Sequence, residues 1–499
     1  MTSRSRTSLA DIAQLIGTTP VDGTVFGAVS YTHLRAHETR HDLFIAARGA
    51  TVHAAKFARL AVAAGAAAVF TDVEGAKIAG DLGVPVLVVA DPARVAGLVA
   101  SYCWGIPDQQ LTTFAVTGTN GKTSTAYMLD DVLTRLGRDT GLIGTVEVRI
   151  AGEAVPAALT TPQPVDLQRI LAQLVERGGT DLVMEASSHA LAQGRTSPIR
   201  FDVAGFTNLT QDHLDYHETL EEYFKAKALL FDEQHSARGV IVVDDEWGQR
   251  LYREVSAARP GCVVSLSLAG NDADWFVTSH VSGSAQHLHL AGPLGTLDTL
   301  TTLPGAFNVA NAALAAVMVL ESGVSVRELE QVLGRRGISP QIPGRMEVVG
   351  ERPYTVVDFA HNTDALVKAM VSLRQLRAGK LIVLTGAAGD RDRGKRPMMA
   401  AAVAEHADYL IVTDDDPHSE DPAQIRSEMI AGIPEGFDFV EIGDRETAIR
   451  EAITTAARED TILIAGRGHE TIQDVAGTAR HIDDRVVARN ALAQRMEEE

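Results

Sequence analysis

The residues with the clearest capacity for chemistry form the segment Gly118-Thr119-Asn120-Gly121-Lys122-Thr123-Ser124. Its two glycines let backbone amides approach phosphate oxygens without a side chain in the way. Lys122 can place a positive charge beside the β and γ phosphates of a nucleotide, and Thr123 can offer its hydroxyl to Mg²⁺. Val116 stands where the longer form of this motif has its first glycine. A plain turn between a strand and a helix would not need the Lys-Thr pair, so the segment predicts a phosphate-binding loop.

Other ionisable side chains follow farther along the chain. Glu185 ends the apolar run 182–184, and a carboxylate at the carboxyl end of a central strand can hold Mg²⁺. The segment 212–217, Asp-His-Leu-Asp-Tyr-His, suits metal or phosphate contact, but a polar surface turn explains its composition about equally well. Lys225 and Lys227 lie on a predicted helix, where lysines are usually solvated. The phosphate loop is what favours a functional interpretation of Glu185 over a solvated strand end.

Three charged loops occur in the last third of the chain. They are the cation-rich segment 386–397, the segment Asp414-Asp415-Asp416-Pro417-His418, and the segment Gly466-Arg467-Gly468-His469-Glu470. Each follows a predicted parallel strand, so the three loops should converge at one edge of a sheet. Their charges suit the recognition of carboxylate or phosphate groups. One such loop is usually surface, whereas three at corresponding strand ends predict a site.

These residues need a scaffold, and the hydrophobic pattern predicts a series of α/β units. In the first unit we expect helices at 54–65 and 92–102, strands at 66–70 and 84–90, and a linker at 106–109. In the second we expect a strand at 113–116, a helix at 123–136, strands at 181–185, 203–208 and 240–244, added antiparallel strands within 263–300, and an apolar helix at 306–321. In the third, strands at 354–358, 380–385, 409–413 and 461–465 alternate with helices, which predicts a parallel, Rossmann-like sheet.

Composition bounds the function class. A chain of 499 residues is too long for one hydrophobic core. The net charge of −20 argues against non-specific nucleic-acid binding, and no apolar run is long enough to span a membrane. Cys103 and Cys262 are expected to be buried thiols rather than a disulfide or a metal site. We therefore expect a cytoplasmic, reducing location.

Taken together, the motifs resemble those of the Mur ligases of peptidoglycan synthesis. The resemblance covers nearly the whole chain and rests on these segments: Gly-Thr-Asn-Gly-Lys-Thr at 118–123, Thr-Thr-Pro at 160–162, Glu-Ala-Ser-Ser-His-Ala-Leu at 185–191, Asp-His-Leu-Asp-Tyr-His at 212–217, Leu-Pro-Gly-Ala-Phe-Asn at 303–308, Pro-Gly-Arg-Met-Glu at 343–347, Asp-Phe-Ala-His at 358–361 and Gly-Asp-Arg-Asp at 389–392. It implies an α/β fold of three domains: a small α/β UDP-sugar-binding domain at 1–110, a central phosphate-loop ATPase domain with added antiparallel strands at 111–342, and a C-terminal Rossmann-like amino-acid domain at 343–499.

The resemblance also implies a reaction. ATP phosphorylates the D-glutamate carboxylate of UDP-N-acetylmuramoyl-L-alanyl-D-glutamate, a diamino acid attacks the acyl phosphate, and phosphate leaves. Among the implied roles, Lys122 is catalytic, and Thr123, Glu185, His213 and a carbamoylated Lys227 hold Mg²⁺. The remaining residues implied for ATP are Gly118, Thr119, Asn120, Gly121, Ser124, Asn308, Asn311, Arg345 and Asp358; those for the muramoyl dipeptide are Thr160, Thr161, Ser187, Gln193 and Arg195; those for the amino acid are Arg391, Asp415, Asp416, His418, Gly466 and Glu470.

Two segments depart from the family pattern. Relatives that add meso-2,6-diaminopimelate usually carry Asp-Asn-Pro-Arg where this chain has Asp415-Asp416-Pro417-His418. The extra negative charge and the lost arginine favour L-lysine, or ornithine, with meso-2,6-diaminopimelate as the alternative. In the N-terminal region, Leu34-Arg35-Ala36 stands where the family has a uridine-binding Asp-Ser-Arg. The segment 30–42 reads like a translated sequencing adapter, and we hypothesise that part of it is an assembly artefact. In either case we expect a reduced affinity for UDP.

Two other functions compete with this interpretation. A ligase of the folylpolyglutamate-synthase type shares the ATPase core, but the Thr-Thr-Pro motif and the loops at 415–418 and 466–470 favour the muramoyl enzyme. A phosphate-loop NTPase switch or an inactive binding module belongs to a different class. It would not need His213, Lys227 and Arg345 together with a complete third domain.

Overall fold

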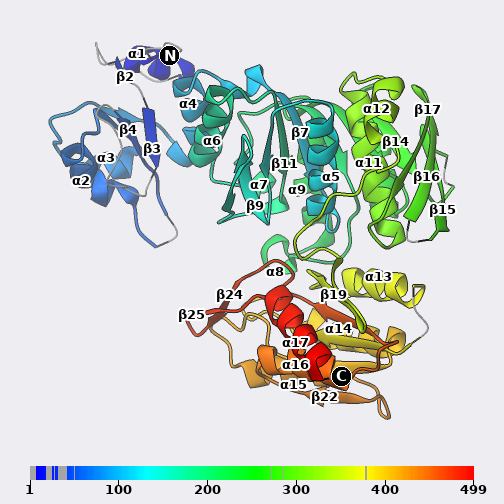
Figure 1. Ribbon diagram of the computed structural model, residues 1–499. Helices are drawn as coiled ribbons and strands as arrows, with labels where there is room; N and C mark the ends of the chain where they lie inside the picture. Colours follow the sequence, from blue (N-terminus) through cyan, green and yellow to red (C-terminus); the bar gives the residue numbers. More distant parts are fainter. Residues whose placement is uncertain are drawn as a thin grey trace. The chain divides into compact units, whose positions relative to one another are not determined.

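The computed structural model describes residues 7–17, 25–26, 28–31, 42–49, 51–270, 272–283, 285–376 and 379–498. The chain forms two compact units (Figure 1). The first comprises residues 1–117, 137–205 and 226–239, and the second comprises residues 118–136, 206–225 and 240–499. The expected domain boundaries after residues 110 and 342 stay a prediction.

The first unit begins with a small parallel sheet in the order β3-β4-β5-β6, formed by β3 (Ala28–Tyr31), β4 (Asp42–Ala46), β5 (Ala68–Thr71) and β6 (Val86–Val88). The short strands β1 (Thr7–Ser8) and β2 (Val25–Phe26) pair separately. Its helices are α1 (Leu9–Leu15), α2 (Ala58–Ala63), α3 (Val73–Ala79) and α4 (Pro92–Cys103). Every residue of β5 is buried, which is why this strand reads as a continuous apolar run.

The rest of the first unit is built on β7 (Thr112–Thr117) and β11 (Asp181–Glu185), which pair in parallel. Beyond β11 lie β8 (Thr140–Ile143), β9 (Glu147–Ile150) and β10 (Glu153–Pro156), of which only β8 is parallel to its inner neighbour. The helices are α6 (Pro164–Glu176) and α7 (Ser188–Ala192). The strands β12 (Phe201–Phe206) and β13 (Ser236–Val242) run from one unit into the other, as does α9 (Leu220–Ala228). The predicted strands at 113–116 and 181–185 are confirmed, whereas β8, β9 and β10 are additional.

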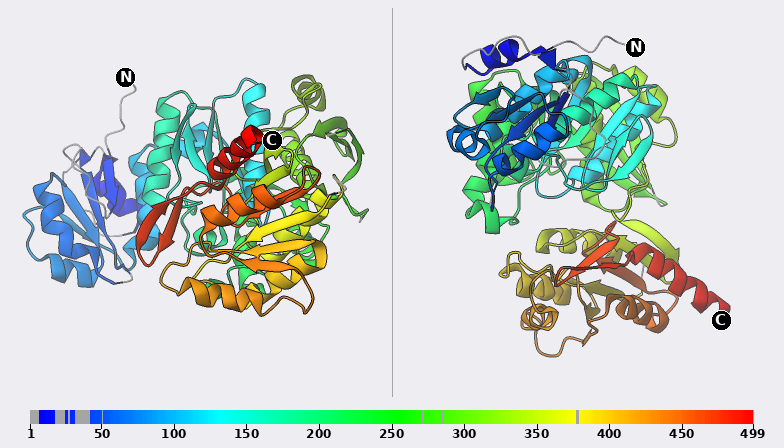
Figure 2. Two further views of the ribbon diagram at one scale, coloured as in Figure 1. Left: turned by 60° about the horizontal axis from the view of Figure 1, so that its bottom comes forward. Right: turned by 90° about the vertical axis from the view of Figure 1, so that its left-hand side faces the viewer.

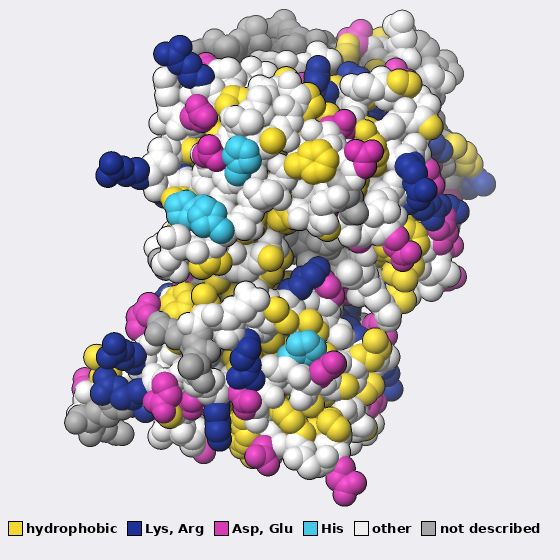
Figure 3. Space-filling model, turned by 90° about the vertical axis from the view of Figure 1, so that its right-hand side faces the viewer, with side chains coloured by type: hydrophobic (Ala, Val, Ile, Leu, Met, Phe, Trp, Pro, Cys, Tyr) yellow, Lys and Arg dark blue, Asp and Glu magenta, His cyan; other side chains and the backbone are white. Residues whose placement is uncertain are grey.

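The second unit contains two buried helices, α5 (Lys122–Arg135) and α11 (Ala306–Glu321), which pack against each other. They are accompanied by α8 (Leu214–His217), α10 (Glu246–Ala258) and α12 (Val326–Leu333). The strands β15 (Trp275–Ser282), β16 (Ala285–Gly292) and β17 (Gly295–Thr301) are antiparallel, as expected for 263–300. The expectation is wrong for β14 (Val263–Ser267), which pairs with β15 in parallel. His280 of β15 stacks on His287 of β16 with ring centroids 5.1 Å apart. Figure 3 shows histidine side chains at the surface of the molecule.

The remainder of the second unit is a six-stranded sheet in the order β18-β19-β23-β20-β21-β22. Its strands are β18 (Glu347–Glu351), β19 (Tyr354–Asp358), β20 (Leu381–Thr385), β21 (Tyr409–Val412), β22 (Phe439–Glu441) and β23 (Thr461–Ala465). All of its pairings are parallel except that of β18 with β19. The predicted Rossmann-like sheet is therefore confirmed, with one added antiparallel edge strand.

Helices cover both faces of this sheet (Figure 2). One apolar cluster includes residues of α13 (Thr363–Arg374), α14 (Lys395–His406) and α15 (Pro422–Ile430). The opposite cluster includes residues of α16 (Arg445–Thr455) and α17 (Asp484–Glu498). A hairpin that the sequence did not predict, β24 (Ile472–Val475) with β25 (Thr478–His481), follows β23.

Two composition-based expectations can be compared with the described residues. Cys103 and Cys262 are both free. Cys103 is buried, and burial raises the pKa of its thiol to about 12, but Cys262 is only partly buried. None of the described helices combines the length and apolar character that crossing a membrane requires.

Candidate functional site

The phosphate loop needs its two glycines for steric reasons. Gly118 and Gly121 have φ angles of 148° and 90°, which side chains strongly disfavour. A Cβ atom on Gly118 would lie 1.9 Å from Thr207 Oγ1, and one on Gly121 would lie 2.4 Å from Asn311 Oδ1. Helix α5 begins directly afterwards at Lys122, so its free amides and positive dipole end face the loop. The local structure therefore supports the prediction of an anion-binding loop.

Polar side chains hold this loop in shape. The Lys122 ammonium donates to the carbonyl oxygens of Gly118 at 3.0 Å and Thr119 at 2.9 Å. Asn120 Nδ2 donates to Asp364 Oδ2 at 2.9 Å, and Asn362 Nδ2 donates to Asn120 Oδ1 at 3.2 Å. Our sequence reasoning missed Asn362 and Asp364. A signal was available, because Asn362 stands at the N-cap of α13, where a polar residue after an apolar strand is expected.

The predicted ATP residues outside the loop lie in three places of the second unit, namely on α11, in the turn before β18 and at the end of β19. Asn308 and Asn311 are buried amides on the otherwise apolar helix α11, and Asn311 Nδ2 donates to Asn308 Oδ1 at 3.3 Å. The Arg345 guanidinium lies 4.1 Å from the centroid of the Phe359 ring and donates to Thr123 Oγ1 at 3.2 Å. The structure therefore brings Arg345 to the phosphate loop.

Asp358 stabilises the segment that carries Arg345. Its carboxylate accepts hydrogen bonds from the backbone amides of Met346 at 2.6 Å and Ala360 at 2.9 Å. Burial raises the pKa of Asp358, although the nearby Arg345 charge opposes the shift. Asp358 thus fixes the turn that precedes β18 and holds the backbone beside Arg345.

Asp212 is the first residue of the Asp-His-Leu-Asp-Tyr-His segment, and the sequence reasoning did not single it out. It is buried, and its carboxylate lies 3.5 Å from His361 Nε2 and 3.9 Å from Lys395 Nζ. Burial opposes its ionisation, but His361, His213 and Lys395 outweigh burial and hold the pKa of Asp212 well below its usual range. His213 itself has a left-handed backbone, with φ 55°, and a partly exposed ring. The segment is therefore an ordered charged cluster rather than a solvated turn.

Glu185 is buried, with an exposed fraction of 1%, so it is not a solvated strand end. It is in register with Val116, two residues before the phosphate loop begins. Thr145, a residue that the sequence reasoning missed, donates from its amide to Glu185 Oε1 at 2.8 Å and from its hydroxyl to Oε2 at 3.0 Å. A Cβ atom on Gly144 would lie 2.4 Å from Glu185 Oε1, so the segment before Thr145 can approach the carboxylate only through glycine.

The residues predicted for the muramoyl dipeptide gather around the end of β11. Thr160 Oγ1 lies 3.1 Å from Thr145 Oγ1, and Thr161 Oγ1 donates to the Glu185 carbonyl at 2.8 Å. The remaining members are linked to Thr161 or to one another: Ser187 N to Thr161 Oγ1 at 3.1 Å, Arg195 Nη1 to the Thr161 carbonyl at 3.0 Å, and Arg195 Nη2 to Gln193 Oε1 at 2.7 Å. The structure thus joins all five residues and Glu185 in one polar network.

The two lysines of α9 have different environments. Lys225 is exposed and lies 3.6 Å from Glu221, as expected of a solvated lysine. Lys227 is 1% exposed, which overturns the expectation from composition that both lysines are solvated. Burying an ammonium group is costly, so the chemistry of Lys227 differs from that of a surface lysine.

The three charged loops of the C-terminal sheet converge as predicted. Gly389 N donates to the Asp416 carbonyl at 2.8 Å, and a Cβ atom on Gly466 would lie 2.4 Å from Asp415 Oδ2. Carboxylate oxygens of Asp415, Asp416 and Glu470 all lie within 4.8 Å of one another. Burial, followed by the charges of Asp415 and Asp416, raises the pKa of Glu470 to about 8. Such a cluster of acids suits an ammonium group or a cation.

A second feature lies beside these acids. Asp390, Arg391, His418, Ser419, Asp474, Ala476 and Gly477 line a cavity of about 610 Å³. His418 Nδ1 lies 3.1 Å from Asp474 Oδ2, and its backbone amide donates to the Asp474 carbonyl at 3.0 Å. The turn of the β24–β25 hairpin therefore supplies one wall of the cavity, which the sequence could not show. Arg391 and His418, both predicted to contact the amino acid, share this cavity.

Comparison with known proteins agrees with this geometry. Residues 116–319 match the Mur ligase middle domain, and residues 344–468 match the Mur ligase, glutamate ligase domain. A protein of Streptomyces coelicolor named UDP-N-acetylmuramoyl-L-alanyl-D-glutamate--2,6-diaminopimelate ligase is 41% identical over 500 residues, which cover 98% of this chain and 97% of the relative. The chain belongs to the Mur ligase family. A UDP-N-acetylmuramyl-tripeptide synthetase of Leifsonia xyli is 42% identical over 462 residues, covering 91% of this Mur ligase and 89% of the relative.

A solved structure extends the likeness to three dimensions. The structure of a UDP-N-acetylmuramoyl-L-alanyl-D-glutamate--2,6-diaminopimelate ligase matches this Mur ligase with a TM-score of 0.65 and 31% identity, over 98% of this chain and 99% of the other. The predicted family, three-domain α/β fold class and enzyme class are therefore confirmed. Two of these three proteins are named for 2,6-diaminopimelate, which favours the alternative substrate, so the preference for L-lysine is corrected.

Proposed function

We propose that this Mur ligase uses ATP to join 2,6-diaminopimelate to the D-glutamate carboxylate of UDP-N-acetylmuramoyl-L-alanyl-D-glutamate. The proposal rests on one observation, which is that the amino-acid loops place a group of acids beside a cavity lined by basic side chains. The acids Asp415, Asp416 and Glu470 suit an ammonium group, and the neighbouring cavity presents Arg391 and His418. Diaminopimelate has a carboxylate at each end, whereas lysine has none at its far end, and cations recognise that difference.

The contacts of Asp416 explain why its negative charge does not select for lysine. Arg467 is completely buried, and its Nη1 lies 2.8 Å from Asp416 Oδ1. Asp416 Oδ1 also accepts a hydrogen bond from the Asp474 amide at 2.8 Å. A charge that is paired inside the protein repels a nearby carboxylate much less than a free one. The preference for lysine had treated Asp416 as an uncompensated charge facing the substrate.

The chemistry follows from the placement of charge. Lys122 and the amides of the phosphate loop hold the γ phosphate, and Arg345 reaches the same loop through Thr123. The D-glutamate carboxylate attacks the γ phosphorus, ADP leaves, and the amine of the diamino acid then attacks the acyl phosphate and expels phosphate. Splitting the reaction in this way replaces one difficult step with two easier ones. Positioned cations stabilise the negative charge that develops on the transferred phosphoryl group.

On the family resemblance we assign Mg²⁺ to this enzyme, because that ion prefers oxygen ligands and neutralises phosphate charge. The residues that would hold it are Thr123, Glu185, His213 and Lys227. We assign a carbamoylated side chain to the buried Lys227 on the family resemblance, because the reaction of its amine with carbon dioxide would give a carboxylate-like ligand. Incubation with ¹³C-bicarbonate, followed by solution NMR of the carbamate carbon, tests this assignment.

The muramoyl dipeptide is assigned to the network of Thr160, Thr161, Ser187, Gln193 and Arg195, whose hydroxyl, amide and guanidinium groups suit carboxylates and peptide groups. The expected departure at Leu34-Arg35-Ala36, and most of the segment 30–42, lies outside the described residues. We place the enzyme in the cytoplasm as a monomer that acts on small molecules and has no nucleic-acid or membrane partner.

The decisive experiment is an amino-acid panel. Purified enzyme is supplied with ATP, Mg²⁺ and UDP-N-acetylmuramoyl-L-alanyl-D-glutamate, and phosphate release and product mass are measured with diaminopimelate, L-lysine and ornithine. We expect diaminopimelate to give the highest kcat/KM and little phosphate release without an amino acid. Faster turnover of L-lysine or ornithine would overturn the choice of substrate. Amino-acid-independent ATP hydrolysis at the full rate would overturn the ligase itself.

A further inference from the structure

A buried arginine joins two of the segments that line the amino-acid cavity, namely the loop after β20 and the loop after β21. Arg396, the second residue of α14, has no exposed side-chain surface. Its Nη2 donates to Glu420 Oε1 at 2.9 Å, and its Nη1 donates to Glu420 Oε2 at 3.1 Å. The same guanidinium also donates to Glu428 Oε2 at 2.6 Å and to the Ala388 carbonyl at 3.2 Å. Paired bonds of this kind fix direction as well as distance.

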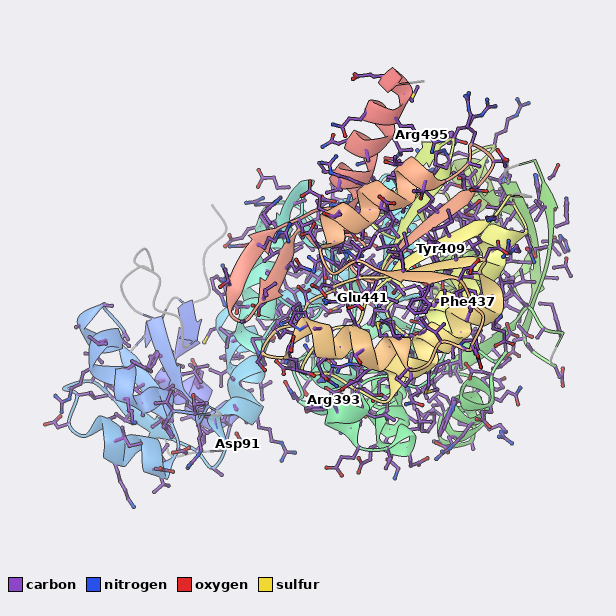
Figure 4. All side chains as sticks on the ribbon, turned by 90° about the horizontal axis from the view of Figure 1, so that it is seen from below. Asp91, Arg393, Tyr409, Phe437, Glu441 and Arg495 are labelled. Atoms are coloured by element: carbon purple, nitrogen blue, oxygen red, sulfur yellow. The ribbon has the colours of Figure 1, made fainter. Side chains whose placement is uncertain are left out.

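Glu420 connects this arginine to the cavity. It accepts a hydrogen bond from the Asp390 amide at 2.6 Å and one from Arg393 Nη2 at 2.7 Å. Figure 4 marks Arg393, which also lies 3.9 Å from Glu428 on α15. The hydrogen bond from Arg396 lowers the pKa of Glu420 to about 2, so this carboxylate is ionised at neutral pH. The ion pair that connects Arg396 to the loop is therefore present at neutral pH.

A second link lies directly at the cavity wall. The Asp390 carboxylate accepts hydrogen bonds from the Ser419 amide at 3.1 Å and the Ser419 hydroxyl at 2.7 Å. Asp390 and His418 both have left-handed backbones, with φ angles of 53° and 48°, which side-chain-bearing residues adopt only when their surroundings impose it. Arg391 follows Asp390, and His418 precedes Ser419. The bonds of Asp390 with Glu420 and with Ser419 therefore lie next to Arg391 and His418, which line the cavity.

The position of this network argues against a purely structural role. A buried ion pair is weak evidence for stability, because its desolvation cost offsets most of its attraction. Arg396 and Glu420 join the same two loops that the Asp390–Ser419 bonds and the backbone bond from Gly389 to Asp416 also connect. We propose that Arg396 and Glu420 are positioning residues that hold Arg391 and His418 where the far end of the diamino acid binds. The identity of that ligand rests on the proposed function.

The test compares Glu420→Gln and Ser419→Ala with Arg374→Gln. The control breaks a partly exposed ion pair, Arg374 with Asp408 at 2.6 Å, which does not line the cavity. The KM values for the diamino acid, ATP and the muramoyl dipeptide are measured separately below the melting temperature of each variant. For Glu420→Gln we expect the KM of the diamino acid to rise about tenfold, as for a lost charge-assisted hydrogen bond, and the other two KM values to change less than about twofold.

Ser419→Ala removes only the hydroxyl bond to Asp390 and keeps the proposal testable if Glu420→Gln does not fold; its expected rise in the same KM is about threefold. The proposal is overturned if the KM of the diamino acid is unchanged in both variants, or if all three KM values rise together as in a general loss of structure. The amino acid used is the best substrate of the wild-type enzyme in the panel. Failure to use diaminopimelate thus rejects the proposed substrate, whereas an unchanged KM rejects the positioning role.

Discussion

The phosphate loop and the loop at 415–418 differ in how far their function depends on distant residues. In the phosphate loop, the glycines, the lysine and the start of α5 are consecutive, and the lysine binds carbonyls within four residues. In the other loop, Asp416 is paired with Arg467, and His418 contacts Asp474. Local sequence therefore reveals the first function, whereas the charge of the second is set by partners about fifty positions later.

The comparison explains why one sequence-based expectation was right and another was corrected. Phosphate binding was predicted from the loop itself, because its glycines, Lys122 and Thr123 lie together in one segment. The diamino acid was predicted from Asp416 and His418 as though they faced the substrate unaccompanied. The buried guanidinium of Arg467 changes that interpretation, since it removes the repulsion on which the preference for lysine depended.

Substitution of Lys122 should cause the largest loss of activity among the variants of the two loops. Lys122→Met should lower kcat/KM by about 10³-fold, because a positioned cation beside the transferred phosphate is lost. Phosphate release in the presence of all three substrates measures the effect. Lys225→Met is the matched control, since Lys225 is an exposed lysine and should leave the rate unchanged. A comparable loss in both variants would show that lysine charge in general, rather than the loop, supports activity.

The substitution Gly121→Ala, which adds a methyl group to the phosphate loop, should have the next largest effect. In Gly121→Ala the new Cβ lies 2.4 Å from Asn311 Oδ1 and the residue must keep a φ of 90°. We expect the KM for ATP to rise roughly 30-fold, because the strain falls on the amides that bind phosphate. The double variant Gly121→Ala/Asn311→Ala removes the contact but not the backbone strain. Full recovery in the double variant would mean that the φ angle contributes nothing.

Breaking the Asp416–Arg467 pair tests the other loop. In Arg467→Met the charge of Asp416 is uncompensated, so kcat/KM for diaminopimelate should fall about tenfold relative to that for lysine. The amino-acid panel measures the ratio. Asp416→Asn in the same background removes the exposed charge and should restore much of the preference. An unchanged ratio in Arg467→Met would show that Asp416 does not influence the far carboxylate.

The sequence predicted the scaffold of both regions well, and for physical reasons. The strands at 354–358 and 461–465 are continuous apolar runs because both faces of the sheet are covered, and their bounds agree with β19 and β23. The charged loops after these strands meet because parallel strands end at one edge. Local pattern thus predicted this scaffold and the convergence of its charged loops, whereas the roles of residues such as Thr160 and Asn308 were implied by the family resemblance.

What the sequence could not predict depends on pairing between remote segments. Thr145 reaches Glu185 across forty residues, and the short β24–β25 hairpin closes the cavity around His418. Neither segment has a strong periodicity of its own, since Thr145 lies in a turn and the hairpin strands have four residues each. Lys227 is similar, because its helix also carries the exposed Lys225 and only the fold distinguishes them.

The smallest expected effect is a pH dependence of amino-acid binding. Burial and the charges of Asp415 and Asp416 raise the pKa of Glu470 from 4.5 to about 8, so the free enzyme holds a proton there at pH 7. Because the folded-state pKa is raised, this carboxyl makes the free energy of unfolding fall as the pH rises from about 4.5 to about 8. An ammonium group bound beside Glu470 favours its ionised form, so binding of the diamino acid should release up to about one proton at pH 7 and tighten modestly towards pH 8. Calorimetry in two buffers of different ionisation enthalpy measures that proton. Glu470→Gln should abolish both the release and the pH dependence, and equal proton release by the variant would place the titrating group elsewhere.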